Sequence, residues 1–182
     1  MSLDKILEKY RLNSTSEKDK GDKFERLIQA FFKSDSLYRD DFVSVDLWKD
    51  FKYKQQFGDI DLGIDLVGYT KDGKYWAIQC KFYADDAKLS SHNVQGLLSE
   101  GGKQFKDESG NLVQFSVNCL VSTAYMGINA QKKTWNRAIE FIDIHRGKLE
   151  KSDVDWEVLD QGIYGKVAQL PKKNFDLIKP RL

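Results

Sequence analysis

Two apolar runs separated by a short polar turn constrain this chain more than any other feature. Residues 63–69 (GIDLVGY) and 75–81 (YWAIQCK) are rich in β-branched and aromatic side chains, which favour strands. The residues between them contain the step Asp72-Gly73, and an Asp-Gly step is a strong signal for a β-hairpin. The pattern therefore predicts that the two runs pair antiparallel through this turn.

The predicted hairpin brings three chemically useful side chains together. Gln79 and Lys81 are two residues apart, so they project from the same face of their strand. Antiparallel pairing places Asp65 near them on the neighbouring strand. A carboxylate, an amide oxygen and an ammonium group at one spot suit a hard divalent cation and the phosphate oxygens that it would polarise.

These motifs resemble a known family of nucleases. GIDLVGY followed by WAIQCK is similar to the Mrr-like branch of the PD-(D/E)XK superfamily, in which an Asp and a (Asp/Glu/Gln)-x-Lys pattern lie on a hairpin. The segments LDKILEKY and DKGDKFERLIQAFF resemble more specifically the N-terminal nuclease domain of Type ISP restriction–modification enzymes. The resemblance covers roughly residues 1–125. It implies an α/β/α restriction-endonuclease-like core, with a central mixed β-sheet flanked by helices.

The resemblance also implies an activity and partners. Type ISP enzymes are single polypeptides that join nuclease, helicase, methyltransferase and target-recognition parts. We therefore expect a DNA endonuclease domain that is covalently linked to such modules and hydrolyses phosphodiester bonds with Mg²⁺, or with Mn²⁺ as a substitute. We expect residues 1–182 to form one nuclease domain, the N-terminal part of a longer chain, with a catalytic core at about 17–145.

The expected site has one carboxylate ligand and several supporting groups. Asp65 would bind Mg²⁺ directly, Gln79 would add a neutral oxygen, and the main-chain carbonyl of Cys80 would complete the protein ligands. Lys81 would stabilise charge that develops at the phosphate. The resemblance further implies that Glu25, on an early helix, reaches the metal site; otherwise it is a solvated charge. Most superfamily patterns have Glu or Asp where this chain has Gln79, so we expect weak Mg²⁺ binding.

Four further residues have less specific assignments. Asp61 is a candidate ligand for a second metal ion, or a support for Asp65, whereas Asp59 is more typical of a turn residue. Gln95, in the helix expected after the hairpin, could contact the DNA backbone, orient Lys81 or simply lie on the helix surface. Ser91 is a second candidate DNA contact near the start of that helix.

Composition places limits on the function. The net charge is +1, from 29 basic and 28 acidic residues, which is low for a protein that binds DNA unaided. We therefore expect another module, or a second copy, to help to hold DNA. Cys80 and Cys119 lie in apolar runs and are expected to be buried free thiols, which fits a reducing cytoplasm. No apolar run is long enough for a membrane span, and the start lacks a signal-peptide core.

Other classes of site are not supported by the sequence. His92 and His145 have no zinc-ligand spacing between them or with the cysteines. The pair Gly101-Gly102 lacks the Lys-Ser/Thr that a P-loop requires.

The rest of the chain is expected to alternate helices and strands. The expected helices span residues 3–11, 17–33, 90–106, 126–138 and 152–159, and the expected strands span 43–47, 115–124 and 141–144. Ser2 is placed to cap the first helix, and Gly21 would shift the start of the second toward Lys20. Aromatic and lysine residues alternate in 48–54, which indicates core packing with lysines extending to solvent more than a nucleic-acid surface.

Two other readings of the same hairpin remain open. A Holliday-junction resolvase-like nuclease would share these motifs but form a stable dimer. A catalytically inactive nuclease fold would bind DNA or a partner without cleavage in Mg²⁺ or Mn²⁺.

Overall fold

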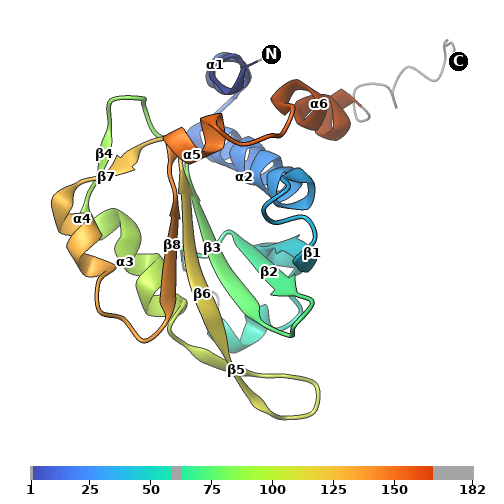
Figure 1. Cartoon of the computed structure of the whole chain (residues 1–182), viewed down its shortest axis with the longest axis vertical. Coiled ribbons are helices and arrows are strands. Elements are labelled where there is room, and N and C mark those ends of the chain that lie inside the picture. Colours follow the sequence, from blue (N-terminus) through green and yellow to red (C-terminus); the bar gives the residue numbers. More distant parts are fainter. Residues whose placement is uncertain (1, 59–62, 166–182) are drawn as a thin grey trace, which may run out of the picture.

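A mixed β-sheet forms the centre of the molecule, as the computed structural model shows for residues 2–58 and 63–165 (Figure 1). Its strands follow the order β1-β2-β3-β6, and β6 pairs with β8 and β5 along its other edge. The strands are β1 (Phe42–Leu47), β2 (Leu66–Thr70), β3 (Tyr75–Lys81), β5 (Gln104–Lys106), β6 (Leu112–Ser122) and β8 (Glu140–Ile144).

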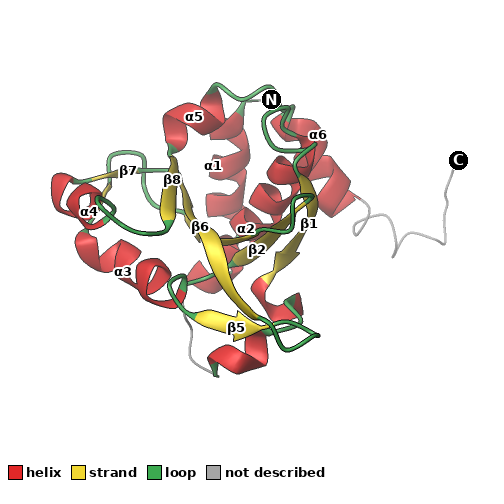
Figure 2. Ribbon diagram, turned by 60° about the horizontal axis from the view of Figure 1, so that its bottom comes forward, coloured by secondary structure: helices red, strands yellow, loops and turns green. Residues whose placement is uncertain are grey.

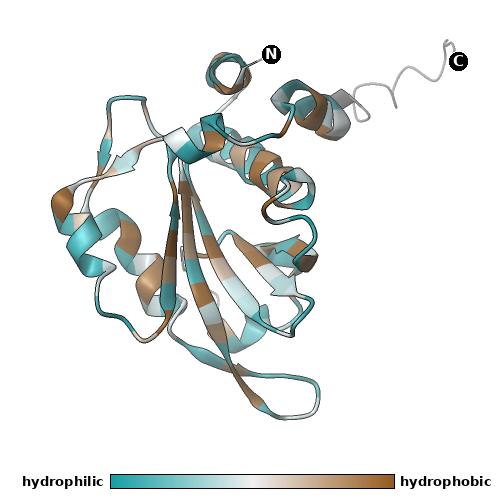
Figure 3. Cartoon of the chain, in the orientation of Figure 1, coloured by the Kyte–Doolittle hydropathy of each residue, from teal (hydrophilic) through white to brown (hydrophobic). Residues whose placement is uncertain are grey.

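The pairing directions follow from the connections between strands. The short turn after β2 returns the chain antiparallel, with Leu66 opposite Ile78, so the predicted hairpin is confirmed. β3, β6 and β8 run parallel, joined by crossovers that contain α3 and α4. Brown, apolar segments lie along β6 and β8 (Figure 3), as expected for parallel strands that are covered on both faces.

Helices cover both faces of the sheet, so the expected α/β/α layers are confirmed (Figure 2). On one face lie α1 (Leu3–Asn13), α2 (Glu17–Ser34) and α6 (Trp156–Asp160). On the other lie η1 (Trp48–Asp50), η2 (Lys54–Phe57), α3 (Ser91–Glu100) and α4 (Ile128–Lys133). The remaining elements are β4 (Lys88–Leu89), β7 (Tyr125–Met126), α5 (Arg146–Glu150) and η3 (Gln161–Gly165).

The two N-terminal helices begin at the predicted residues, Leu3 and Glu17. Ser2 occupies the N-cap position of α1, but its side chain makes no capping hydrogen bond. α2 begins at Glu17 as predicted, and Gly21 does not shift its start to Lys20, because the hydroxyl of Ser16 accepts a hydrogen bond from the amide of Asp19. This cap stabilises the first turn and outweighs the cost of Gly21 inside the helix.

β1 contains an irregularity that changes which side chain it buries. The register with β2 shifts between Phe42 and Ser44, and such a bulge reverses the alternation of faces locally. Val43 is therefore exposed and Phe42 is buried, whereas Val45 and Leu47 are buried as expected. In the aromatic segment that follows, residues 48–54, Phe51 is buried in the apolar core on the face of the sheet that α3 and α4 cover. This burial supports the prediction that the aromatic residues of this segment pack in the core.

Two helices end earlier than predicted. α3 stops at Glu100, because Gly101 packs against Asn118 of β6 and its carbonyl accepts a hydrogen bond from that amide. Residues 104–106 then form β5 instead of a continued helix. α4 stops at Lys133, and Asn136 adopts a positive φ of 53° that no helix tolerates.

The segment after β8 packs onto the N-terminal helices. Leu149 and Trp156 are buried in the same core as α2, and the hydroxyl of Tyr10 donates a hydrogen bond to Asp160. α6 starts after Asp155, whose carboxylate caps it, and not at Ser152 as predicted. The sequence did not predict α5. The folded unit thus extends past residue 145.

In the part of the chain that the structure describes, none of the helices combines the length and apolar character needed to cross a membrane.

Candidate active site

Asp65 lies at the start of β2, where its main chain is held on both sides. Its amide donates to the carbonyl of Ile78 on β3, and its carbonyl accepts from the amide of Trp48 after β1. The carboxylate oxygen Oδ2 accepts a 2.8 Å hydrogen bond from the amide of Cys80. These contacts fix the carboxylate against the strand that carries Gln79 and Lys81.

Gln79 is buried, with 4% of its surface exposed, although its side chain is polar. Its Oε1 accepts no hydrogen bond from any residue that the structure describes. Burial of an amide oxygen without a partner costs about 1–3 kcal/mol, so such an atom calls for an explanation. Its Nε2 side is packed against Gly63, where a Cβ would lie 3.0 Å from that nitrogen.

Lys81 extends from the same face of β3, and its ammonium lies 6.0 Å from the ring centre of Tyr83. No carboxylate among residues 2–58 and 63–165 pairs with it in an ion pair. The hydroxyl of Tyr83 accepts a hydrogen bond from Asn93 of α3, which fixes the ring beside Lys81.

Glu25 of α2 reaches Asp65 from the other side. Burial raises the pKa of Glu25 to about 8, helped by the negative charges of Asp65 and Asp22 and by a hydrogen bond with Asp65. Two close carboxyl groups in a partly dry site do not ionise together easily. A bound cation would remove that repulsion.

The three predicted hairpin residues open onto one hollow of about 510 Å³. Asp65, Gln79 and Lys81 line it together with the main chain at Cys80, and the start of α3 forms its far wall. A neighbouring hollow of about 490 Å³ contains Glu25 and again Asp65, so Asp65 lies between the two.

The other predicted site residues are distributed as follows. Gln95 lines the hollow of the hairpin residues. Ser91, the first residue of α3, lines a smaller hollow nearby, and Ser90 caps the helix. Asp61 and Asp59 lie outside the described residues. Cys80 and Cys119 are free thiols, and burial raises the pKa of both.

Sequence reasoning missed three residues that shape the hollow. Gly63 has φ +73°, which favours glycine, and packs against both Gln79 and the main chain of α3. Asn93 forms a capping box with Ser90, a pattern visible in the sequence as Ser-x-x-Asn. Tyr83 gives no sequence signal, because only the folded chain brings it to Asn93.

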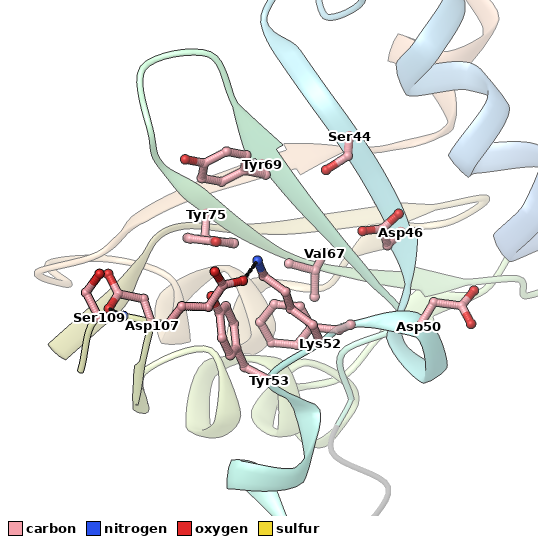
Figure 4. Close-up of a pocket in the computed structure, with 12 residues that line it drawn as sticks. Ser44, Asp46, Asp50, Lys52, Tyr53, Val67, Tyr69, Tyr75, Asp107 and Ser109 are labelled. Atoms are coloured by element: carbon pink, nitrogen blue, oxygen red, sulfur yellow. Dashed lines mark hydrogen bonds and ion pairs between the residues drawn. The ribbon is translucent and has the colours of Figure 1, made fainter. Parts of the chain in front are cut away.

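A further hollow of about 500 Å³ lies toward the turn end of the hairpin (Figure 4). Tyr53, Tyr69 and Tyr75 line it, and Lys52 crosses it in an ion pair with Glu108. Its other charged residues are Asp46, Asp50 and Asp107. Because carboxylates outnumber its lysine, this hollow does not suit a phosphate, and it contains none of the predicted catalytic residues.

Metal-binding capacity at the hairpin rests on mixed oxygen donors. Among the described residues, no three His, Cys, Asp or Glu side chains are grouped as metal ligands. The available donors are the carboxylates of Asp65 and Glu25, the amide oxygen of Gln79 and main-chain carbonyls. Hard oxygen donors of this kind suit Mg²⁺, which keeps several water ligands.

Comparison with known proteins identifies the family of this chain. A family model described as restriction endonuclease (Mrr_cat_2) matches residues 33–166. The chain belongs to this restriction endonuclease family. The expected Mrr-like relationship is therefore confirmed. A search of curated proteins found no match.

A solved structure has the same fold as this member of the restriction endonuclease family. The "ATP-dependent Type ISP restriction-modification enzyme LlaBIII bound to DNA" matches with a TM-score of 0.64 and 22% sequence identity over 86% of this chain. The chain covers 9% of the length of that protein. The likeness confirms the expected restriction-endonuclease-like fold.

Proposed function

We propose that this chain is a DNA endonuclease domain that hydrolyses phosphodiester bonds with Mg²⁺, and that Mn²⁺ can substitute. The observation that carries the proposal concerns Gln79, a residue that lines the same hollow as Asp65 and Lys81. Its buried Oε1 has no hydrogen-bond partner among the described residues. A metal ion or its water ligand would satisfy this oxygen. Membership of the restriction endonuclease family supports the same chemistry.

Different residues of the chain would bind the cation and stabilise charge on the phosphate. Asp65 and Gln79, with the carbonyl of Cys80 and with Glu25, would hold the cation. When bound, Mg²⁺ supplies charge neutralisation at the phosphate and lowers the pKa of an attacking water. The ammonium of Lys81 stabilises negative charge on the phosphate oxygens in the transition state. The Cys80 amide orients the carboxylate of Asp65 through its hydrogen bond to Oδ2.

Weak metal binding in the absence of DNA is part of the proposal. Asp65 is the one carboxylate in the hollow of Gln79 and Lys81 among the residues described there. Phosphate oxygens of DNA would add the missing negative charge, so cation and substrate should bind together.

We further propose that the domain acts inside a longer restriction–modification enzyme with helicase, methyltransferase and target-recognition parts. The small share of the LlaBIII chain that it covers supports this context. The net charge of +1 supports it too, since most DNA affinity would come from the linked parts.

The first experiment combines plasmid nicking with metal binding. We expect the chain to nick supercoiled plasmid in Mg²⁺ or Mn²⁺ but not in EDTA. Asp65→Asn should lower the rate at least about 100-fold, because the substitution removes the charged ligand while preserving shape. Asp46→Asn, an exposed change on β1, is the matched control.

A metal-binding readout makes the test independent of turnover. Mn²⁺ should raise the unfolding temperature of the unsubstituted chain and of Asp46→Asn, but not of Asp65→Asn. Equal nicking by Asp65→Asn and the unsubstituted chain would overturn the assignment of Asp65. No nicking and no Mn²⁺ stabilisation of the unsubstituted chain would favour the inactive-fold reading.

A further inference from the structure

A long stretch of this chain contains no carboxylate side chain. No Asp or Glu occurs in residues 109–139, although 28 of the 182 residues are acidic. The charged residues in this stretch are Lys132, Lys133 and Arg137. These three cations therefore have no carboxylate within the stretch to offset their charge.

The fold places these cations beside α3, the helix whose start lines the candidate active site. α4 packs against α3, and the two helices lie side by side at the edge of the molecule opposite α2 (Figure 1). The start of α3 contributes His92 and Asn93 to the hollow of Asp65 and Lys81. One residue earlier, Ser91 lines a hollow of about 280 Å³ that it shares with Ile128 of α4. The start of α4 therefore lies near the catalytic hollow. Lys132, Lys133 and the turn at 134–137 follow at the other end of α4, near Leu98 of α3.

The side chains of this region are open to a partner. Lys132 and Lys133 are exposed and have no ion pair with any residue that the structure describes. On α2, by contrast, lysines pair with neighbouring carboxylates, as in Lys23 with Asp19. An unpaired, solvated lysine has no existing ion pair to break when it binds an anion.

An aromatic ring accompanies these charges. Trp135 is 52% exposed, which is unusual for so large an apolar side chain. It follows α4 in a turn that is tied to α3, because the guanidinium of Arg137 donates a 3.3 Å hydrogen bond to the carbonyl of Leu98. The turn thus presents Trp135 beside the two lysines.

We propose that the end of α4 and the turn at 134–137 bind the sugar–phosphate backbone of duplex DNA that extends along α3 away from the phosphate that is cleaved. Lys132 and Lys133 neutralise phosphates, and Trp135 packs against a sugar or an accessible base face. This inference rests on the proposed function and adds the path of the substrate. Ile128 of α4 is also exposed, so a protein partner is the competing occupant. The exposed, unpaired charges of Lys132 and Lys133 favour a polyanion, and DNA is the polyanion that the proposed function supplies.

The test measures DNA binding without cleavage. A fluorescently labelled 30-base-pair duplex is titrated with the Asp65→Asn chain, and the dissociation constant is followed by anisotropy at several salt concentrations. Adding Lys132→Ala and Lys133→Ala should raise the dissociation constant about 10-fold to 100-fold at 0.1 M salt. The slope of log affinity against log salt should fall by about 1.8, because each lost phosphate contact removes about 0.9.

A matched pair controls for the loss of two positive charges. Lys33 and Lys71 are exposed, and no described carboxylate pairs with either of them. Lys33→Ala with Lys71→Ala should leave the slope within about 0.3 of the starting value. If both pairs lower affinity equally, net charge is responsible and the proposed surface is wrong.

Tryptophan quenching provides a local readout. The chain has four tryptophans, and DNA should protect the exposed Trp135 from iodide. Trp135→Phe should remove this protection. If the α4 variants bind DNA and are quenched as before, and the unsubstituted chain still nicks plasmid, the proposed DNA-binding surface is wrong. The proposed nuclease activity would then stand. A loss of association with the linked modules, without any loss of DNA affinity, would instead identify a protein interface and overturn the proposal.

Discussion

The main-chain amide of Cys80 donates a 2.8 Å hydrogen bond to Oδ2 of Asp65, which links the two strands of the hairpin at the candidate metal site. The carboxylate is thereby fixed relative to Gln79 and Lys81, the two residues that flank Cys80. A site that must align a cation, a water and a phosphate benefits from such fixed geometry, because less motion has to be frozen during the reaction.

Gln79→Glu is expected to tighten metal binding. The new carboxylate would replace the amide oxygen that has no hydrogen-bond partner among the described residues, and a hard cation prefers a charged oxygen. Nicking should persist, and the Mg²⁺ concentration for half-maximal nicking should fall several-fold. Gln114→Glu, on an exposed part of β6, is the control and should leave the midpoint unchanged. An unchanged midpoint in both variants would place Gln79 outside the coordination sphere.

Lys81→Ala is expected to lower the rate much more than DNA affinity. Removal of one preorganised charge at a transition state typically costs about 100-fold or more. Single-turnover nicking at saturating protein separates rate from binding. Asn93→Ala removes the hydrogen bond that fixes Tyr83 and should produce a smaller, roughly 3-fold to 10-fold loss. A Lys81→Ala variant that binds DNA poorly but cleaves normally at saturation would show that Lys81 is an anchor.

Gly63→Ala tests how tightly the hollow is built. A Cβ at Gly63 would lie 3.0 Å from both Nε2 of Gln79 and the amide nitrogen of Leu97, and φ is +73°. We expect about 1–3 kcal/mol of destabilisation and a large loss of nicking, since Gln79 or α3 must move. Gly21→Ala is the control, because nothing lies within 4 Å of a Cβ there. It should stabilise the protein by about 0.5–1 kcal/mol. Urea unfolding measures both.

The hairpin could be predicted because its signals are local. The strand-forming runs and the Asp-Gly turn lie within 26 residues, and the antiparallel register follows from them. The grouping of Asp65, Gln79 and Lys81 in one hollow is a direct consequence of that register.

Errors occur where distant contacts decide the structure. α3 ends at Glu100 because the side chain of Asn118, on the distant strand β6, donates a hydrogen bond to the carbonyl of Gly101. No residue between Glu100 and Lys106 indicates this end in the sequence. Similarly, no periodicity predicts that Tyr83 meets Asn93, or that the residues after 145 complete the core of α2. The sequence pattern also does not indicate that Glu25 is buried. Its proximity to Asp65 was predicted through family resemblance alone.

Glu25 is expected to make the stability of the metal-free protein depend on pH. Its pKa in the folded protein is about 8, raised from 4.5 by burial and by Asp65 and Asp22. The folded state therefore binds this proton more tightly than the unfolded state. The resulting stabilisation is complete below about pH 4.5 and is lost as pH rises through about 8. After allowance for solvent screening, we expect the loss to be about 1–3 kcal/mol.

Glu25→Gln should remove this dependence, because an amide cannot ionise. In EDTA, urea unfolding between pH 5 and 8.5 should show a free energy of unfolding that falls less with pH than in the unsubstituted chain. Glu140→Gln, an exposed change on β8, should follow the unsubstituted chain. Mg²⁺ should restore stability at high pH in the unsubstituted chain but less in Glu25→Gln, because cation binding requires the ionised carboxyl. Parallel pH curves for Glu25→Gln and the unsubstituted chain would mean that Glu25 is solvated and does not take part in the metal site.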